Sequence, residues 1–200
     1  CPSTLARWTK INDAPFSWTS NMGSVFNNLL FVIPTDNVAR DSVYDLNGQS
    51  VGTIPARPFA EAGGFGSCAV QVPARQGEIF VFGGAVRSGT TTSLTNRLVF
   101  FLTTTTSPGW QPAGFAIPTT STAIPQYGMA CAGYNQYAFI MGGYGSNFSP
   151  TNGVYRADLI TNPTNAWSAR ASMPTAVAYA AADESGGKIY LCGGLVNNNP

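Results

Sequence analysis

The sequence of 200 residues contains no histidine. This absence excludes Ser-His-Asp and Cys-His catalysis, because both arrangements need an imidazole as the base. It also removes the commonest protein ligand for zinc, copper and iron. We therefore assign no catalytic residue and no metal ligand in this chain, and we expect no cofactor.

Charged side chains are scarce, at 10% of the residues. The formal net charge is +1 and the basic residues are scattered, so the clustered positive charge that nucleic-acid binding requires is missing. No hydrophobic run approaches the roughly 20 residues of a membrane-spanning helix. Threonine, serine, asparagine, glycine and proline are abundant instead, which is typical of a β-rich protein with many turns and suits an extracellular setting.

The chain begins with Cys1 rather than methionine. We therefore expect a processed product or a fragment from which any signal peptide has been removed, and an extracellular, secreted location. Attachment of a lipid at Cys1, as in a bacterial lipoprotein, is the alternative interpretation.

A short apolar run that ends in paired glycines occurs three times. From Gly83 to Gly142 is 59 residues and from Gly142 to Gly193 is 51, which is a period of about 50. The three runs occupy Gly77–Gly84, Gln136–Gly143 and Gly187–Gly194, and a degenerate copy occupies Asn28–Thr35.

A second marker has the same period. Tryptophan is followed by proline seven or eight residues later, and a segment of small residues comes after the proline. These pairs are Trp8 with Pro15, Trp110 with Pro118, and Trp167 with Pro174. The repeat therefore predicts four short strands: an inner strand of small residues, an apolar strand ending in Gly-Gly, a third strand, and a fourth that carries the tryptophan.

These features resemble Kelch repeats. The resemblance rests on the glycine pairs, on Tyr155 after one of them, with Tyr44 in the degenerate copy, and on the tryptophans, and it covers nearly the whole chain. The repeat-defining residues are Gly83, Gly84, Gly142, Gly143, Gly193, Gly194, Trp8, Trp110 and Trp167. The resemblance implies an all-β, Kelch-like β-propeller with four-stranded antiparallel blades, of the kind found in secreted galactose oxidase-type and glyoxal oxidase-type proteins.

The repeat places three full blades at 16–57, 58–118 and 119–174. Residues 5–15 are expected to form the outer strand of a shared blade, and residues 176–194 the start of another blade. The whole chain is then one propeller segment with fewer blades than the family usually has, so we expect it to belong to a larger ring. The alternative is that the chain closes as a small four-bladed ring or meets another subunit.

The apolar second strands should be buried, with the following side chains in the core: Phe80, Phe82, Phe139, Met141, Tyr190 and Cys192. We interpret the glycine pairs as tight exits from buried strands, because no helix follows them to make a phosphate loop. We interpret the tryptophans as packing residues between blades rather than as sugar-stacking platforms.

The four cysteines permit disulfides in a secreted chain. Cys68 and Cys131 align at one inner-strand position of neighbouring blades, where the Cα separation should exceed the roughly 7 Å limit of a disulfide. We therefore expect both to be small buried thiols. A bond between Cys1 and Cys192 becomes feasible only if the chain closes as a four-bladed ring.

The tripeptide Asn147-Phe148-Ser149 is an acceptor motif for N-glycosylation, in a loop that follows a glycine pair. Thr90–Ser93 is interpreted either as loop and edge-strand threonine or as an acceptor of O-glycans.

Two classes of function remain open. The first is a non-catalytic extracellular module that has a structural role or binds a protein or glycan partner, with self-assembly included. The alternative is the propeller portion of a secreted copper-radical oxidase, whose copper ligands include histidines that this chain lacks. Exposed Trp or Tyr side chains on one face would favour sugar binding.

Overall fold

The computed structural model describes residues 21–34, 41–45, 47–54, 68–75, 77–88, 91–94, 98–102, 109–112, 117, 124–161 and 167–196. Strands and turns make up these residues, and none of them is helical. The predicted all-β class is therefore confirmed for the described part of the chain. No helix in that part is long and apolar enough to cross a membrane. The expected outer strand at 5–15, which carries Trp8, lies outside the described residues, and so does Cys1.

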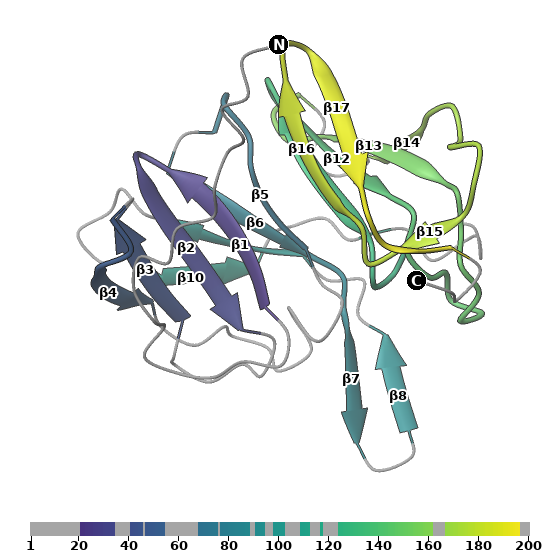
Figure 1. Ribbon diagram of the computed structural model, residues 1–200, viewed down its shortest axis with the longest axis horizontal. Helices are drawn as coiled ribbons and strands as arrows, with labels where there is room; N and C mark the ends of the chain where they lie inside the picture. Colours follow the sequence, from purple (N-terminus) through teal and green to yellow (C-terminus); the bar gives the residue numbers. More distant parts are fainter. Residues whose placement is uncertain are drawn as a thin grey trace, which may run out of the picture.

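Three four-stranded antiparallel sheets form the main body (Figure 1). In each sheet the neighbouring strands follow chain order, and each sheet lies inside one of the three ranges that the repeat delimits. The first sheet contains β1 (Asn21–Phe26), β2 (Leu29–Pro34), β3 (Asp41–Asp45) and β4 (Ser50–Ile54). The second contains β5 (Cys68–Gln71), β6 (Glu78–Phe82), β9 (Leu98–Leu102) and β10 (Gly109–Pro112). The third contains β11 (Ala130–Tyr134), β12 (Tyr137–Met141), β13 (Val154–Asp158) and β14 (Trp167–Ala169).

Three two-stranded pairs complete the described structure. One is a hairpin inserted between β6 and β9, which projects away from the sheets in Figure 1. The other two follow the third sheet in the chain. The pairs are β7 (Ala85–Ser88) with β8 (Thr91–Leu94), β15 (Val177–Ala178) with β18 (Leu195–Val196), and β16 (Ala181–Ser185) with β17 (Lys188–Cys192). The inserted hairpin includes most of the Thr90–Ser93 segment.

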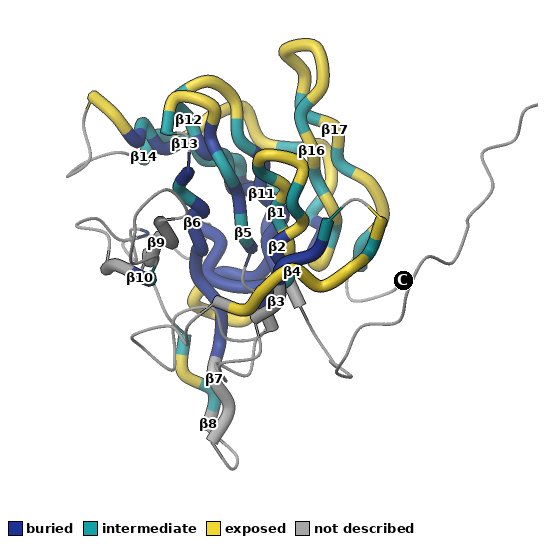
Figure 2. The backbone as a smooth tube through the Cα atoms, turned by 90° about the vertical axis from the view of Figure 1, so that its left-hand side faces the viewer, coloured by how far each residue is buried: buried dark blue, intermediate teal, exposed yellow. Residues whose placement is uncertain are grey.

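Alternate side chains of β6 serve two different interfaces. Phe80 and Phe82 belong to a cluster shared with the third sheet, whereas Ile79 and Val81 belong to one shared with the first sheet. This division follows from the pleat of a strand, which directs successive side chains to opposite faces. Because β6 is apolar on both faces, it is buried between its two neighbours, as Figure 2 shows.

The predicted burial of the second strands holds for the central strands and fails for the last one. Phe80, Phe82 and Met141 are buried, and Phe139 is half-buried. The prediction was wrong for Tyr190, which is 58% exposed, and for Cys192, which is also exposed. Tyr190 and Cys192 stand before their glycine pair as Phe80 and Phe82 do. Their side chains therefore point to the face of the sheet that, in the second sheet, packs against the next sheet. Among the described residues no further sheet follows β17, so this face has no cover.

The two described repeat tryptophans pack against the preceding sheet. Trp110 of the second sheet is buried in the cluster that includes Phe31 and Ile33 of the first. Trp167 of the third sheet meets Phe82 of the second edge-on, with ring centroids 5.5 Å apart. Edge-to-face contacts of this kind are a favourable arrangement of aromatic rings. Both tryptophans therefore join neighbouring sheets.

The glycine pairs connect each sheet to the segment that leads into the next one. The amide of Gly84 donates to the carbonyl of Gln126 at 2.8 Å, and that of Gly143 donates to Val177 at 2.7 Å. All six repeat glycines have positive φ, a region that L-residues with a side chain rarely adopt. A Cβ on Gly142 would lie 2.2 Å from the Val177 carbonyl oxygen, so glycine is required there by contact as well as by conformation.

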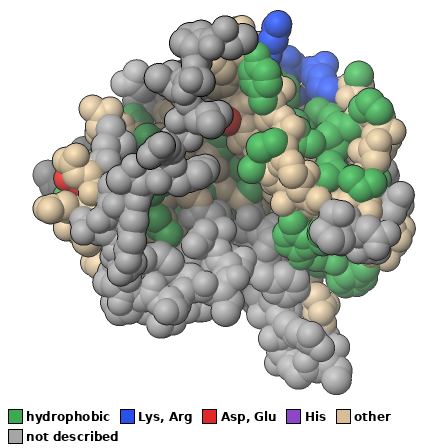
Figure 3. Space-filling model, in the orientation of Figure 1, with side chains coloured by type: hydrophobic (Ala, Val, Ile, Leu, Met, Phe, Trp, Pro, Cys, Tyr) green, Lys and Arg blue, Asp and Glu red, His purple; other side chains and the backbone are tan. Residues whose placement is uncertain are grey.

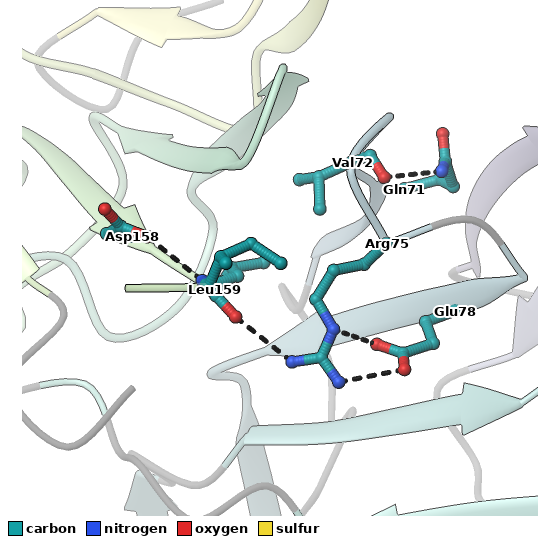
Figure 4. Close-up of polar contacts among 7 residues, drawn as sticks. Gln71, Val72, Arg75, Glu78, Asp158 and Leu159 are labelled. Atoms are coloured by element: carbon teal, nitrogen blue, oxygen red, sulfur yellow. Dashed lines mark hydrogen bonds and ion pairs between the residues drawn. The ribbon is translucent and has the colours of Figure 1, made fainter. Parts of the chain in front are cut away.

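The turn between β5 and β6 is tied to the end of β13 (Figure 4). The Arg75 guanidinium donates to the Leu159 carbonyl at 3.1 Å and to the Glu78 carboxylate at 2.8 Å. The amide of Ala74 donates to the Asn135 carbonyl at 2.9 Å, between the first turns of the second and third sheets. These contacts fix the two sheets at the end remote from the glycine pairs.

The expected alignment of Cys68 with Cys131 is wrong by one residue. Cys68 lies opposite Phe82 in the second sheet, whereas Cys131 lies opposite Ile140 in the third. Met141 precedes its glycine pair as Phe82 does, and the residue opposite Met141 is Ala130. The turn between the first two strands is longer in the second sheet than in the third. This difference in length hides the one-residue offset between the two cysteines when the sequences are aligned. Both cysteines are free, buried thiols, as predicted.

Candidate functional site

An aromatic cluster lies where the loops of the third sheet meet the segment between β15 and β16. Tyr127 and Tyr144 stack with ring centroids 4.9 Å apart and an interplanar angle of 17°. Phe148 extends the stack on one side, 6.0 Å from Tyr127, and Tyr179 extends it on the other, 5.9 Å from Tyr144. Four rings from three separate segments thus form one continuous aromatic stack, in which Tyr127 and Tyr144 are buried and the two outer rings are exposed.

Backbone hydrogen bonds fix the segments that carry the rings. The amide of Tyr144 donates to the Tyr127 carbonyl at 2.8 Å, in an isolated antiparallel bridge. The amide of Tyr179 donates to the Gly128 carbonyl at 2.7 Å. A Cβ on Gly128 would lie 3.3 Å from ring atoms of both Tyr144 and Tyr179. The absence of a side chain at Gly128 therefore lets these two rings approach the backbone.

The outer rings of the cluster are exposed on a strained backbone. Phe148 is 48% exposed with φ of 59°, and Tyr179 is 47% exposed with φ of 56°. A bulky residue in the left-handed region is an outlier that costs about 1–3 kcal/mol, and such residues gather at ligand sites. The strain is maintained by the surrounding hydrogen bonds. It holds two apolar rings at the surface, where they gain little from burial.

Tyr127 and Tyr179 keep their protons at neutral pH. Burial, followed by the neighbouring Tyr179 and Tyr144, raises the pKa of Tyr127. Burial, followed by Tyr144, raises the pKa of Tyr179. A neutral phenol can both donate and accept a hydrogen bond. The cluster therefore combines ring faces with hydroxyl groups, and carries no charge of its own.

Asn147, the predicted glycosylation site, lies in the loop that carries Phe148. Its side chain is exposed and its Oδ1 accepts a hydrogen bond from the Ser149 amide at 3.1 Å. The loop is closed by the amide of Gly145, which donates to the Ser149 carbonyl at 3.1 Å. The acceptor nitrogen is therefore presented on a tight surface turn beside the aromatic cluster.

A cavity of about 520 Å³ lies between the first strands of successive sheets. Residues of β1, β5, β11 and β16 line it, and β5 lies beside β1 and β11, while β11 also lies beside β16. Its wall includes the side chains or backbone of Ser24, Gln71, Cys131, Asp183 and Glu184. The lining is thus mainly small and polar, as the predicted small-residue strands suggest.

The remaining predicted sites are not brought together by the structure. Cys192 is an exposed free thiol, and Cys1 lies outside the described residues, so a bond between them stays a prediction. Within the described ranges, no group of three or more Asp, Glu and Cys side chains is placed to hold a metal ion. Asp158 on β13 serves a turn, because its Oδ1 accepts from the amides of Ile160 and Thr161 at 3.0 and 2.8 Å.

The aromatic cluster was missed by the sequence interpretation. Tyr127 and Tyr179 each stand in a segment of small residues before an inner strand, and Tyr144 follows a glycine pair directly. Figure 3 shows hydrophobic side chains gathered over the part of the molecule that contains β11–β18. The signal in the sequence that could have indicated the cluster is the recurrence of a tyrosine at these loop positions.

Comparison with known proteins gives a likeness in fold. No family model matches the sequence, and no curated protein matches it. The solved structure of YjhT is similar to this chain, with a TM-score of 0.53 and 13% sequence identity. The match covers 92% of this chain and 75% of that one. At this identity the similarity concerns the fold alone.

Proposed function

We propose that the chain is part of a Kelch-like β-propeller that acts outside the cell as a non-catalytic, carbohydrate-binding module. Three successive four-stranded sheets and the cavity between their first strands support the propeller interpretation. The uncovered face of β17 supports a ring with further sheets, since Tyr190 occupies a position that is covered in the second sheet.

The observation that carries the binding proposal is the aromatic cluster with two half-exposed rings, Phe148 and Tyr179. A pyranose ring presents apolar C–H groups on its faces and hydroxyls at its edge. Flat aromatic rings match the C–H groups of the sugar. The tyrosine hydroxyls, together with exposed Asn147 and Ser149, match its hydroxyl groups. The lack of charged groups in the cluster favours a neutral sugar over an acidic ligand.

Replacing Tyr179 or Phe148 by alanine should weaken glycan binding by about two- to tenfold each, because a lost ring contact is worth about 0.5–1.5 kcal/mol. The full-length secreted protein is screened on an array of neutral oligosaccharides, and affinity for the strongest binder is measured by calorimetry. The measurement is made in an Asn147→Gln background, so that a glycan carried by the protein itself does not occupy the rings.

Tyr134→Ala provides the matched control, because Tyr134 is also an exposed tyrosine but lies on β11, away from the cluster. Its affinity should equal that of the parent. The carbohydrate proposal is abandoned if the parent binds no oligosaccharide, or if the Tyr179→Ala/Phe148→Ala double variant binds as well as Tyr134→Ala. Binding only to proteins through the same rings would redirect the proposal to a protein partner.

Asn147 should carry an N-linked glycan when the protein is made in a eukaryotic secretory pathway, because the acceptor is exposed on a tight turn. Intact mass before and after treatment with an amidase that removes N-glycans measures its occupancy. Ser149→Ala, which removes the hydroxyl of the motif, should abolish the mass difference. An unmodified Asn147 in material secreted from such cells would contradict the prediction.

A further inference from the structure

Cys68 and Cys131 face each other across the interface between the second and third sheets. Each lies opposite a residue of a single buried cluster, Cys68 opposite Phe82 and Cys131 opposite Ile140. Both cysteines belong to that same cluster. Successive side chains of a strand alternate between faces, so two equivalent positions would point in the same direction. The one-residue offset turns the two thiols toward one another instead.

The two strands that carry these thiols are unusually close. A Cβ on Gly133, two residues after Cys131, would lie 2.1 Å from the Gln71 carbonyl oxygen and 3.0 Å from a methyl group of Val70. The side chains of Cys68 and Cys131 are within hydrogen-bonding reach. Burial, then this hydrogen bond and the charge of Cys131, raises the pKa of the Cys68 thiol.

The two cysteines differ in their relation to the cavity between the first strands. Cys131 is one of the residues that line it, whereas Cys68 is not among the residues of its wall. The cavity has a volume of about 520 Å³ and is open to solvent. We therefore expect the attack to start at Cys131 and Cys68 to complete the exchange.

We propose that Cys68 and Cys131 are a redox-active pair that closes to an intersheet disulfide by exchange with a small disulfide oxidant such as oxidised glutathione. The Cys131 sulfur, having lost its proton to solvent, bonds to one glutathione sulfur and displaces the other as a thiolate. The Cys68 sulfur then loses its proton, attacks the Cys131 sulfur and displaces the second glutathione. Two protein thiols are oxidised to one disulfide, the disulfide of oxidised glutathione takes up the two electrons, and the two glutathione thiolates that leave take up the two protons.

The expected consequence is a covalent connection between two sheets whose described residues meet through side-chain packing and a few hydrogen bonds. A cross-link over a chain segment of this length should raise the melting temperature by about 5–10 °C. The exchange needs only an oxidising thiol buffer, so it is independent of the proposed binding of carbohydrate.

The test uses the full-length protein with Cys1→Ser and Cys192→Ser, which leaves only the pair. The reduced protein is incubated with oxidised glutathione, and free thiols are then alkylated before intact-mass and non-reducing peptide analysis. We expect loss of about 2 Da, no alkylation, and a peptide pair joining Cys68 to Cys131. With Cys68→Ala added, Cys131 should stop at the mixed disulfide and gain about 305 Da.

Three results would overturn the proposal. One is complete alkylation of both thiols after exposure to the oxidant. Another is a stable glutathione adduct on Cys131 while Cys68 is present and free, which would mean that the second exchange cannot occur. The third is a linked pair that lowers the melting temperature relative to the reduced protein, since the folded structure would then not hold the two sulfurs in position to bond. If Cys68→Ala does not fold, Cys68→Ser serves in its place.

Discussion

Replacing Phe82 by alanine should lower the free energy of unfolding by about 3–5 kcal/mol, the range for deletion of a fully buried aromatic ring. Phe82 is 0% exposed, and its ring meets Trp167 edge-on and Phe80 in a stacked arrangement, with centroids 5.5 and 6.5 Å away. These contacts span two sheets whose spacing is fixed elsewhere by Arg75 and by the glycine pairs. The cavity left by the ring therefore has little freedom to collapse, which places the loss near the upper end of the range.

Equilibrium unfolding in urea measures this loss, with the transition followed by tryptophan fluorescence and by far-ultraviolet circular dichroism. Tyr134→Ala is the matched control, because Tyr134 is also an aromatic residue of a strand, at the end of β11, but is exposed. Its change should stay within about 0.5 kcal/mol, as for surface substitutions. Similar losses for the two variants would contradict the assignment of Phe82 to the interface between sheets.

Replacing Gly142 by alanine should lower the free energy of unfolding by about 2–5 kcal/mol. Two effects contribute. The φ of 64° is unfavourable for any residue with a Cβ, and the new Cβ would lie 2.2 Å from the Val177 carbonyl oxygen. That carbonyl also accepts the hydrogen bond from Gly143, so its displacement weakens the connection to the next segment.

Gly186→Ala separates the two effects. Gly186 lies in the turn between β16 and β17 with φ of 62°, and a Cβ there would meet nothing within 4 Å among the described atoms. The loss should therefore reflect conformation alone, about 1–2 kcal/mol. Both variants are compared by the same urea transitions. If Gly142→Ala is no more harmful than Gly186→Ala, the contact with Val177 does not constrain the fold.

The sheets were predictable because each local signal agrees with the next. Apolar runs such as Glu78–Phe82 alternate between two interfaces and must be buried on both faces, and the glycines after them permit a turn that other residues resist. The same reasoning failed at Tyr190 and Cys192. Their burial depends on a neighbouring sheet, and a repeat pattern does not predict whether that neighbouring sheet is present.

The candidate site was less predictable, because its parts come from separate loops. Tyr127, Tyr144 and Tyr179 meet only once the third sheet and the following segment are in place. The hairpin of β7 and β8 also escaped notice, since Thr90–Ser93 is equally suited to a loop. The facing of Cys68 and Cys131 depends on a single residue of register, which the glycine pairs do not determine.

Because an apolar strand such as β6 packs against two neighbouring sheets, it should tolerate insertions less well than the connections between strands do. Inserting one residue into β6 would exchange Phe80 and Phe82 with Ile79 and Val81, so both interfaces of the sheet would be mismatched at once. An insertion in a connection leaves both interfaces intact. The repeats of this chain differ in their connections, including the extra hairpin between β6 and β9 and the ring-bearing loop after β12. Variation in length, and with it the acquisition of new surfaces, is thereby confined to the loops.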